Sequence, residues 1–237
     1  MTHSHDSHAP VALVTGASRG LGLALVSGLV EQDWEVVVDG RDAAALAAAT
    51  RTFGDRVVAV PGDVADPAHR SALLAAVERY GRLDLLVHNA STLGQSPMPR
   101  VDGLHAAVLR HALEVNVVAP SELTRLLLPH LRRARGTVLA ITSDAAVEPY
   151  ETWGAYGASK AALDQLVAVL ATEEPDLVVH AVDPGDMRTQ MHADAFPGED
   201  ISDRPLPETV VPHLLRLLDT DRAGVRLRTS DLVAVAR

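Results

Sequence analysis

The chain has 237 residues, no cysteine and a formal net charge of −10. The absence of cysteine excludes disulfide bonds and thiolate metal sites, and the negative charge disfavours nucleic acid and anionic membranes as partners. Aromatic residues make up only 3% of a chain that is 47% hydrophobic, so we expect a core built mainly from alanine, valine and leucine.

The first ten residues, MTHSHDSHAP, have neither the apolar centre nor the cleavage pattern of a signal peptide. We expect residues 1–10 to form a disordered tail, in which His3, His5 and His8 bind metal at most weakly, and we assign no metal site elsewhere. No apolar run approaches the roughly 20 residues that cross a bilayer. The sequence therefore predicts a soluble, cytoplasmic protein with no membrane partner.

Strand-like and helix-like segments alternate along the chain. The predicted strands are short apolar runs rich in β-branched residues: Val11–Thr15, Glu35–Asp39, Val57–Pro61, Leu83–His88, Thr137–Thr142 and Leu177–Asp183, with a last short one near Val225–Arg228. The predicted helices are Ala- and Leu-rich stretches with helical periodicity: Gly20–Glu31, Asp42–Thr52, Pro67–Tyr80, Leu104–Arg133, Tyr156–Thr172 and Glu208–Leu218.

This alternation predicts an α/β fold, a doubly wound parallel sheet of about seven strands with helices on both faces, in three layers. We expect residues 11–237 to form a single domain, since no linker or repeat divides them. The one irregular segment, residues 186–207, is rich in proline and acidic residues. We expect it to be a lid over the substrate; a surface connection without a role is the alternative.

Glycine and polar residues follow the carboxyl ends of the predicted strands, where ligands bind in such sheets. The run Thr15–Gly22 follows the first strand and Asp63 follows the third. Asn89, Ser143 and the pair Pro184–Gly185 follow the fourth, fifth and sixth strands. The sequence therefore predicts one extended site along this edge of the sheet.

Tyr156 and Lys160 are four residues apart, so a helix places them on one face. A lysine ammonium beside a phenol favours the phenolate and lowers the phenol pKa from about 10, which proton exchange near neutral pH requires. In isolation such a pair is most often an ordinary exposed helical pair. Here Ser143 precedes Tyr156 by 13 residues and Asn116 precedes Ser143 by 27. Order and spacing together indicate proton transfer at a carbonyl oxygen while a cofactor transfers hydride.

These residues and the glycine pattern resemble the short-chain dehydrogenase/reductase family, in the single-domain branch that carries TGxxxGxG and YxxxK. The resemblance covers essentially the whole chain after the first ten residues. It implies a Rossmann-type fold and an NAD(P)-dependent oxidoreductase that acts on CH–OH or C=O groups. The reaction it favours is the reversible, NADPH-dependent reduction of a ketone or aldehyde in a small molecule to an alcohol.

The resemblance also implies residue roles. Tyr156 would be the general acid/base and Ser143 would hold the substrate oxygen. Lys160 would lower the pKa of Tyr156 and contact the nicotinamide ribose, and Asn116 would hold a water that links Lys160 to solvent. The cofactor would contact Gly16, Ser18, Arg19, Gly20, Leu21, Gly22, Arg41, Asp63, Val64, Asn89, Ala90, Tyr156, Lys160, Pro184, Gly185 and Thr189.

Some of these positions have alternatives or departures. Asp63 could cap its own loop instead of meeting the adenine ring. Asn116 could satisfy backbone groups in a helix where Pro120 frees a carbonyl. His88 and Ser91 stand where the family has Asn and Gly. We expect His88 to pack at the strand end, and Ser91 to restrict the backbone and put the local geometry in doubt.

The end of the second predicted strand bears on the choice of cofactor. Gly40 stands where an NAD-preferring member has an acid that holds the ribose 2′-hydroxyl. Arg41 and Arg19 could instead converge on a 2′-phosphate. Strand alternation turns Asp39 to the opposite side, although a one-residue shift in register would reverse this. We therefore expect NADP(H) to be favoured over NAD(H).

The substrate is a small carbonyl compound or alcohol that the sequence does not identify. Four residues could line a mixed apolar pocket or simply pack together: Tyr150, Trp153, Met187 and Phe196. By resemblance we expect a homodimer or homotetramer that pairs through Leu104–Arg133 and Tyr156–Thr172. The alternatives are a non-catalytic dinucleotide-binding sensor or scaffold, an NAD-dependent alcohol dehydrogenase, and a carrier-protein-dependent ketoreductase, which the acidic charge disfavours.

Overall fold

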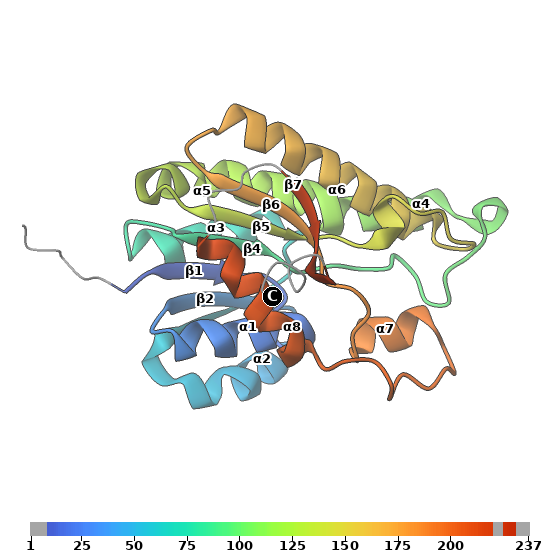
Figure 1. Ribbon diagram of the computed structural model, residues 1–237, viewed down its shortest axis with the longest axis horizontal. Helices are drawn as coiled ribbons and strands as arrows, with labels where there is room; N and C mark the ends of the chain where they lie inside the picture. The colour runs from blue at the N-terminus through green and yellow to red at the C-terminus, as the bar shows by residue number, and fades with distance from the viewer. Residues whose placement is uncertain (1–8, 220–224, 231–237) are drawn as a thin grey trace, which may run out of the picture.

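A computed structural model describes residues 9–219 and 225–230. Most of the predicted tail, with its three histidines, lies outside these ranges. In Figure 1 the strands form one central sheet that is covered by helices on both faces. Within the described part of the chain, no helix is both long enough and apolar enough to cross a membrane.

The sheet has seven parallel strands in the order β3-β2-β1-β4-β5-β6-β7. The doubly wound α/β fold predicted from the sequence is therefore confirmed. The strands are β1 Val11–Val14, β2 Glu35–Gly40, β3 Val57–Pro61, β4 Leu85–His88, β5 Thr137–Ile141, β6 Val178–Asp183 and β7 Val225–Arg228.

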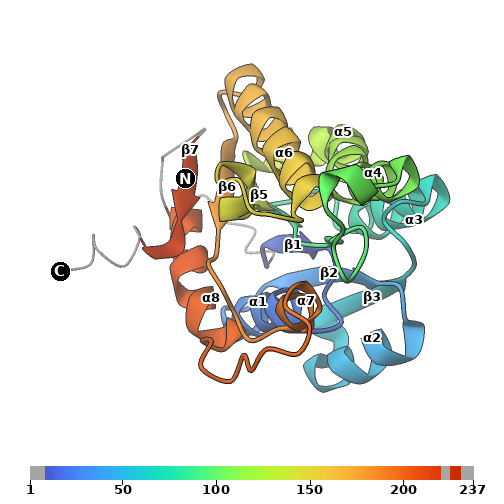
Figure 2. The same cartoon turned by 90° about the vertical axis from the view of Figure 1, so that its right-hand side faces the viewer.

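Two apolar layers hold the helices against the sheet, because successive strand residues point to opposite faces. One layer packs α1, α2 and α8 and the other packs α3, α5 and α6 (Figures 1 and 2). The α-helices are α1 Gly20–Glu31, α2 Ala43–Thr50, α3 Pro67–Glu78, α4 Ala106–Leu113, α5 Ala119–Ala134, α6 Gly154–Glu173, α7 Gln190–Ala195 and α8 Pro207–Leu215. Short 3₁₀ turns are η1 Arg51–Arg56, η2 Val101–Gly103, η4 Asp144–Ala146 and η5 Arg216–Asp219.

Two predicted segments differ from the structure. The long helix predicted over Leu104–Arg133 is divided, because a π-helical turn, η3 Glu114–Val118, separates α4 from α5. Pro120 has no amide hydrogen and cannot close a regular helical bond, which explains the break. The segment predicted to be irregular contains the short helix α7, in which the Thr189 hydroxyl caps the His192 amide.

Thr15 joins the ends of the two central strands. Its side-chain oxygen accepts hydrogen bonds from the amides of Asn89 at 3.0 Å and Ala90 at 3.1 Å, and its hydroxyl donates to Val87 O at 3.2 Å. Thr15 is only 2% exposed, so these groups exchange little with water. The carboxyl ends of β1 and β4 are therefore fixed side by side.

We expect Thr15→Val to lower the free energy of unfolding by about 1–2 kcal/mol, because the isosteric change leaves the Ala90 amide without an acceptor. Urea denaturation measures this change. Thr50→Val is the matched control, since the buried Thr50 hydroxyl only donates to a helix carbonyl, Leu46 O. Equal stability changes in the two variants would contradict the assignment.

Candidate active site

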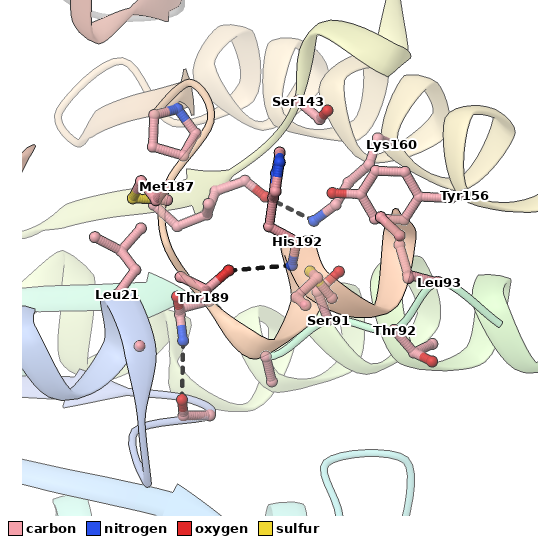
Figure 3. Close-up of a pocket in the computed structure, with 18 of the residues that line it drawn as sticks. Leu21, Ser91, Thr92, Leu93, Ser143, Tyr156, Lys160, Met187, Thr189 and His192 are labelled. Atoms are coloured by element: carbon pink, nitrogen blue, oxygen red, sulfur yellow. Dashed lines mark hydrogen bonds between the residues drawn. The ribbon is translucent and has the colours of Figure 1, made fainter. Parts of the chain in front are cut away.

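A cleft of about 780 Å³ runs along the carboxyl edge of the sheet. It is lined by every residue predicted to contact the cofactor except Gly22, and by three of the four predicted catalytic residues. In Figure 3 the hydroxyl of Tyr156 and the ammonium of Lys160 lie next to each other and point into this cleft. The fourth catalytic candidate, Asn116, is fully buried behind the wall.

The glycine run forms a close-packed turn between β1 and α1. A Cβ on Gly16, whose φ is +69°, would lie 2.8 Å from Ala90 Cα, and a Cβ on Gly22 would lie 2.5 Å from Asn89 Nδ2. Asn89 Nδ2 in turn donates to the carbonyls of Thr15 at 2.7 Å and Gly16 at 3.1 Å. Asn89 therefore holds the turn by these hydrogen bonds. The absence of a side chain at Gly22 leaves the space that the Asn89 amide occupies.

Helix α1 begins at this turn without a side-chain cap. Arg19 occupies the N-cap position, makes no side-chain capping bond, and no acidic residue lies in the first turn. Free amides and the helix dipole at such a start favour an anion. The turn and the cleft together fit the pyrophosphate of a dinucleotide.

Asp39 is buried and is fully engaged with the protein. Its Oδ1 accepts from the Gly16 amide at 2.6 Å, and its Oδ2 lies 3.0 Å from Nε2 of His69. Both side chains are more than nine-tenths buried. The His69 ring packs where Gly62 has no side chain, since a Cβ there would lie 2.1 Å from Nδ1. Asp39 thus holds the glycine turn.

Arg19 and Arg41 are exposed, and both line the cleft together with Gly40. Neither guanidinium has a hydrogen bond or ion pair with any residue that the structure describes. Two unpaired cations here make this end of the cleft suited to a further anionic group.

Asp63 and Val64 lie at the same end of the cleft. Asp63 Oδ1 accepts from the Ala65 amide at 2.9 Å, so this carboxylate does cap its own loop, and it also lines the cleft. Val64 is 8% exposed and packs against Val115 and Ala119.

Tyr156 and Lys160 lie on one face of α6, as their spacing predicts. Tyr156 is 7% exposed and Lys160 is 2% exposed. Lys160 Nζ donates to Ile141 O at 2.8 Å and lies 5.6 Å from the centre of the Tyr156 ring. The lysine is therefore anchored to the end of β5 rather than bonded to the phenol oxygen.

Burial decides the ionisation of both groups. It raises the pKa of Tyr156, with the nearby carboxylates of Asp183 and Asp144 acting in the same direction. Hydrogen bonds to the hydroxyls of Ser143 and Ser91 lower that pKa but do not outweigh burial. Burial also lowers the pKa of Lys160 to about 8. The expected lowering of the Tyr156 pKa is thus wrong for this structure, in which burial raises that pKa.

Ser143 lies two residues after the end of β5 and caps the start of the η4 turn. Its hydroxyl donates to Asp144 Oδ1 at 3.0 Å and accepts from the Ala145 amide at 3.2 Å. Helix α6 approaches this turn closely at Gly157, where a Cβ would lie 2.7 Å from Ala145 O. This close approach brings Tyr156 beside Ser143.

The side chain of Asn116 lies in the π-helical turn and uses all its hydrogen-bonding capacity. Its Nδ2 donates to Thr92 O and Ser159 Oγ, each at 2.8 Å. Its Oδ1 accepts from the Thr92 amide at 2.9 Å and the Ser91 hydroxyl at 3.1 Å. Ser91 therefore links Asn116 to Tyr156, a connection that the sequence did not indicate. Ser91 does not have a positive φ, so replacing the family's glycine with serine causes no backbone strain at this position.

His88 packs at the end of β4, as expected. It is 5% exposed, and its Nε2 lies 2.7 Å from Thr124 Oγ1. Burial, and after it the charge of Lys160, lower the pKa of His88 to about 3. His88 is therefore neutral at physiological pH.

The loop after β6 closes the opposite wall of the cleft. Gly185 has φ +76° and donates its amide to Asp183 Oδ1 at 3.0 Å, while Pro184 O accepts from the Thr229 hydroxyl at 2.9 Å. Thr189 then lies next to Gly20, since a Cβ added to Gly20 would be 3.6 Å from Thr189 Cγ2. The loop after β6 therefore reaches the start of α1.

An aromatic group surrounds Trp153 at the mouth of the cleft. The ring centres of Tyr150, Tyr156 and Phe196 lie 5.8, 5.7 and 5.6 Å from that of Trp153. Of the four predicted substrate residues, Trp153 and Met187 line the cleft, whereas Tyr150 and Phe196 pack behind Trp153. Tyr150 instead donates its hydroxyl to Asp144 Oδ2 at 2.8 Å.

The family model described as short chain dehydrogenase matches residues 10–200. The chain belongs to this family. A short-chain dehydrogenase is an oxidoreductase, and this chain is therefore an NAD(P)-dependent enzyme of that class.

Relatives of this short-chain dehydrogenase support the assignment. An uncharacterised oxidoreductase of Saccharomyces cerevisiae, YIR035C, is 36% identical over 184 residues, covering 76% of this chain and 72% of the relative. The yeast benzil reductase ((S)-benzoin forming) IRC24 is 36% identical over 196 residues, covering 78% and 74%. A structure from Escherichia coli CFT073, described as a short-chain dehydrogenase complexed with NADPH, matches with 29% identity and a TM-score of 0.86, covering 93% and 96%.

We expect Gly62→Ala to destabilise this dehydrogenase by about 1–3 kcal/mol, because the added Cβ overlaps the His69 ring and breaks its contact with Asp39. Urea denaturation reports the loss. Gly103→Ala is the matched control, since its Cβ would meet nothing closer than Pro99 Cβ at 3.9 Å. A Gly62→Ala variant as stable as the control would show that His69 is not fixed as described.

Proposed function

We propose that this enzyme uses NADPH to reduce a ketone or aldehyde in a neutral, largely apolar small molecule to an alcohol. The observation that carries the proposal is the buried Tyr156 beside Ser143, at the end of a cleft that fits a dinucleotide. A phenol carries its proton at neutral pH because its ordinary pKa is about 10, so Tyr156 has a proton to give to a carbonyl oxygen as that oxygen gains charge.

Tyr156 donates the proton to the substrate oxygen, and the Ser143 hydroxyl holds that oxygen in place by a hydrogen bond. Lys160, mostly charged at neutral pH with a pKa of about 8, stabilises the phenolate that forms when the proton leaves. Its anchor on Ile141 O keeps the ammonium near the ring. The bound nicotinamide supplies the hydride to the carbonyl carbon.

Proton return to Tyr156 requires a path to solvent. The side-chain amide of Asn116 is fully bonded, so it has no capacity left to hold a water molecule. Its main-chain carbonyl lacks a helical partner at Pro120. We assign the water that connects Lys160 to solvent to this carbonyl, while the side chain fixes the π-helical turn.

Three parts of the cleft would hold the cofactor. The glycine turn and the start of α1 take the pyrophosphate, Asp63 and Val64 flank the adenine, and the loop from Pro184 to Thr189 faces the nicotinamide. Arg19 and Arg41 then bind a ribose 2′-phosphate. This assignment, and with it the preference for NADPH over NADH, is supported by Asp39, whose carboxylate is occupied by Gly16 and His69 and so is not available to a ribose hydroxyl.

The substrate end favours flat apolar groups. Leu93, Tyr156, Trp153 and Met191 form one apolar cluster there. Asp144, Glu148, Asp186 and Asp194 also line the cleft, which disfavours a strongly anionic substrate. One relative is named for its action on benzil, an aromatic diketone, and benzil is therefore a suitable test substrate.

We also propose that the enzyme is a homo-oligomer paired through α5 and α6. The outer face of α6 exposes small and apolar side chains, among them Ala158, Ala161, Leu166 and Val169. Small residues on this face permit another helix to approach closely. The pairing is consistent with the alternatives of a dimer or a tetramer.

We expect Arg41→Met and Arg19→Met each to weaken NADPH binding roughly 10-fold, since each removes a charge-assisted hydrogen bond to the phosphate. NADH binding should be unaffected, because it has no 2′-phosphate. Calorimetric titration measures both. Arg51→Met is the matched control, as Arg51 is exposed and lies outside the cleft lining. Tighter binding of NADH than NADPH to the unmodified enzyme would overturn the proposed preference.

We expect Tyr156→Phe to reduce kcat for NADPH-dependent reduction of benzil by roughly 10²–10⁴-fold, the usual contribution of a general acid. NADPH affinity should survive, because the ring and its packing are kept. Tyr80→Phe is the control, because Tyr80 follows the end of α3 and does not line the cleft. A dinucleotide sensor without catalytic activity would bind NADPH but show no turnover with any of a panel of ketones, even before the substitution.

A further inference from the structure

Arg226 on β7 contacts three parts of the active site from outside the cleft. Its Nε donates to Asp164 Oδ2 on α6 at 2.9 Å. Its Nη2 donates to Ser143 O at 2.7 Å, at the point where β5 turns into η4. The side chain is 23% exposed, so the guanidinium is largely removed from water.

The same nitrogen also faces the end of β6. Nη2 lies 3.6 Å from Asp183 Oδ2, and Asp183 Oδ1 accepts from the Gly185 amide. Burial raises the pKa of Asp183, while Arg226 and Arg228 both act to lower it. Arg226 thus helps keep the carboxylate that shapes the Pro184–Gly185 turn ionised.

Asp164 follows Lys160 by four residues and lies on the next turn of α6. An ion pair between Arg226 and Asp164 therefore fixes the helix one turn beyond the catalytic pair. The planar guanidinium is suited to this arrangement, because it can direct separate N–H groups at a carboxylate and a carbonyl at once. A lysine ammonium would lack this fixed fork.

We propose that Arg226 is a positioning residue, which holds the main chain of Ser143 at a set distance from the helix that carries Tyr156 and Lys160. The kinetic part of this inference rests on the proposed function. A displacement of about 1 Å between such groups can cost on the order of 10²-fold in rate. The mutual placement of the serine hydroxyl and the phenol thus depends on a side chain that does not line the cleft.

The first experiment compares Arg226→Met, Arg226→Lys and the control Arg132→Met, using benzil and NADPH. Arg132 donates its Nε to Glu174 on the surface at 2.9 Å, remote from the cleft. We expect Arg226→Met to lower kcat roughly 10–100-fold with little change in KM or NADPH affinity. Arg226→Lys should recover part of kcat, and Arg132→Met should leave it unchanged. Unchanged kcat in a folded Arg226→Met variant would overturn the proposal.

A double variant tests whether Arg226 acts through Ser143. If it does, Arg226→Met combined with Ser143→Ala should have nearly the kcat of Ser143→Ala alone, because interacting residues are not additive. If the kcat losses of the two single variants multiply in the double variant, Arg226 does not act through Ser143 and the proposed route is overturned. If Arg226→Met fails to fold, Asp164→Asn replaces it. That change breaks the ion pair with α6 and keeps the bond to Ser143 O, so we expect kcat to fall with little change in KM; unchanged kcat in a folded Asp164→Asn variant would overturn the proposal.

Hydrogen exchange measured by mass spectrometry tests the positioning without turnover. We expect Arg226→Met to accelerate amide exchange over residues 145–148, which follow Ser143, relative to both the unmodified enzyme and Arg132→Met. Equal exchange in all three proteins would overturn the proposal. If the unmodified enzyme does not reduce benzil or any other ketone, the proposed function fails, whereas this exchange measurement still decides the role of Arg226.

Discussion

The close approach of the glycine turn to the end of β4 is the constraint on which the cleft depends. Gly16 and Gly22 come so near Ala90 and Asn89 that no side chain fits between them. Hydrogen bonds from Asn89 and Ala90 to Thr15 then join the two segments. Because this contact joins the two central strands, it also sets where α1 begins and therefore where an anion can bind. The buried Asp39 carboxylate adds a further anchor to the same turn.

At the other end of the cleft, burial governs the chemistry more than charge does. Tyr156 and Lys160 are both nearly inaccessible to solvent. Burial favours the neutral form of each group, so it raises the pKa of Tyr156 and lowers that of Lys160. The pair is thus poised between a neutral phenol and a lysine that titrates near neutral pH. Ser143 and Ser91 oppose the effect on the phenol without reversing it. The sheet and α6 position Tyr156 and Lys160, and the burial of the two side chains sets the direction of their pKa shifts.

Local patterns predicted the fold and most of the cleft wall. Runs of valine and leucine gave strand positions to within two residues, and the glycine spacing located the turn, because both features depend on neighbours in the chain. Pairs formed across the fold were not predictable in this way. Asp39 meets His69 across 30 positions and Arg226 meets Ser143 across 83, and no periodicity links them. The ionisation of Tyr156 was misjudged for a related reason, since burial is a property of the assembled structure. Helix α7 was missed because its composition resembles a loop, although Thr189 is a recognisable cap.

The π-helical turn between α4 and α5 breaks the regular α-helical repeat of this long segment. Such a turn accommodates one extra residue, so the helix before it is rotated relative to the helix after it. Asn116 faces Ser159 and the loop after β4, while Leu123, Leu127 and Leu131 of α5 still face the sheet. Inserting or deleting a single residue in this segment would therefore change which way one of its two helices faces. Shortening it by one would restore a smoother helix and a sound core, yet would turn Asn116 away from α6.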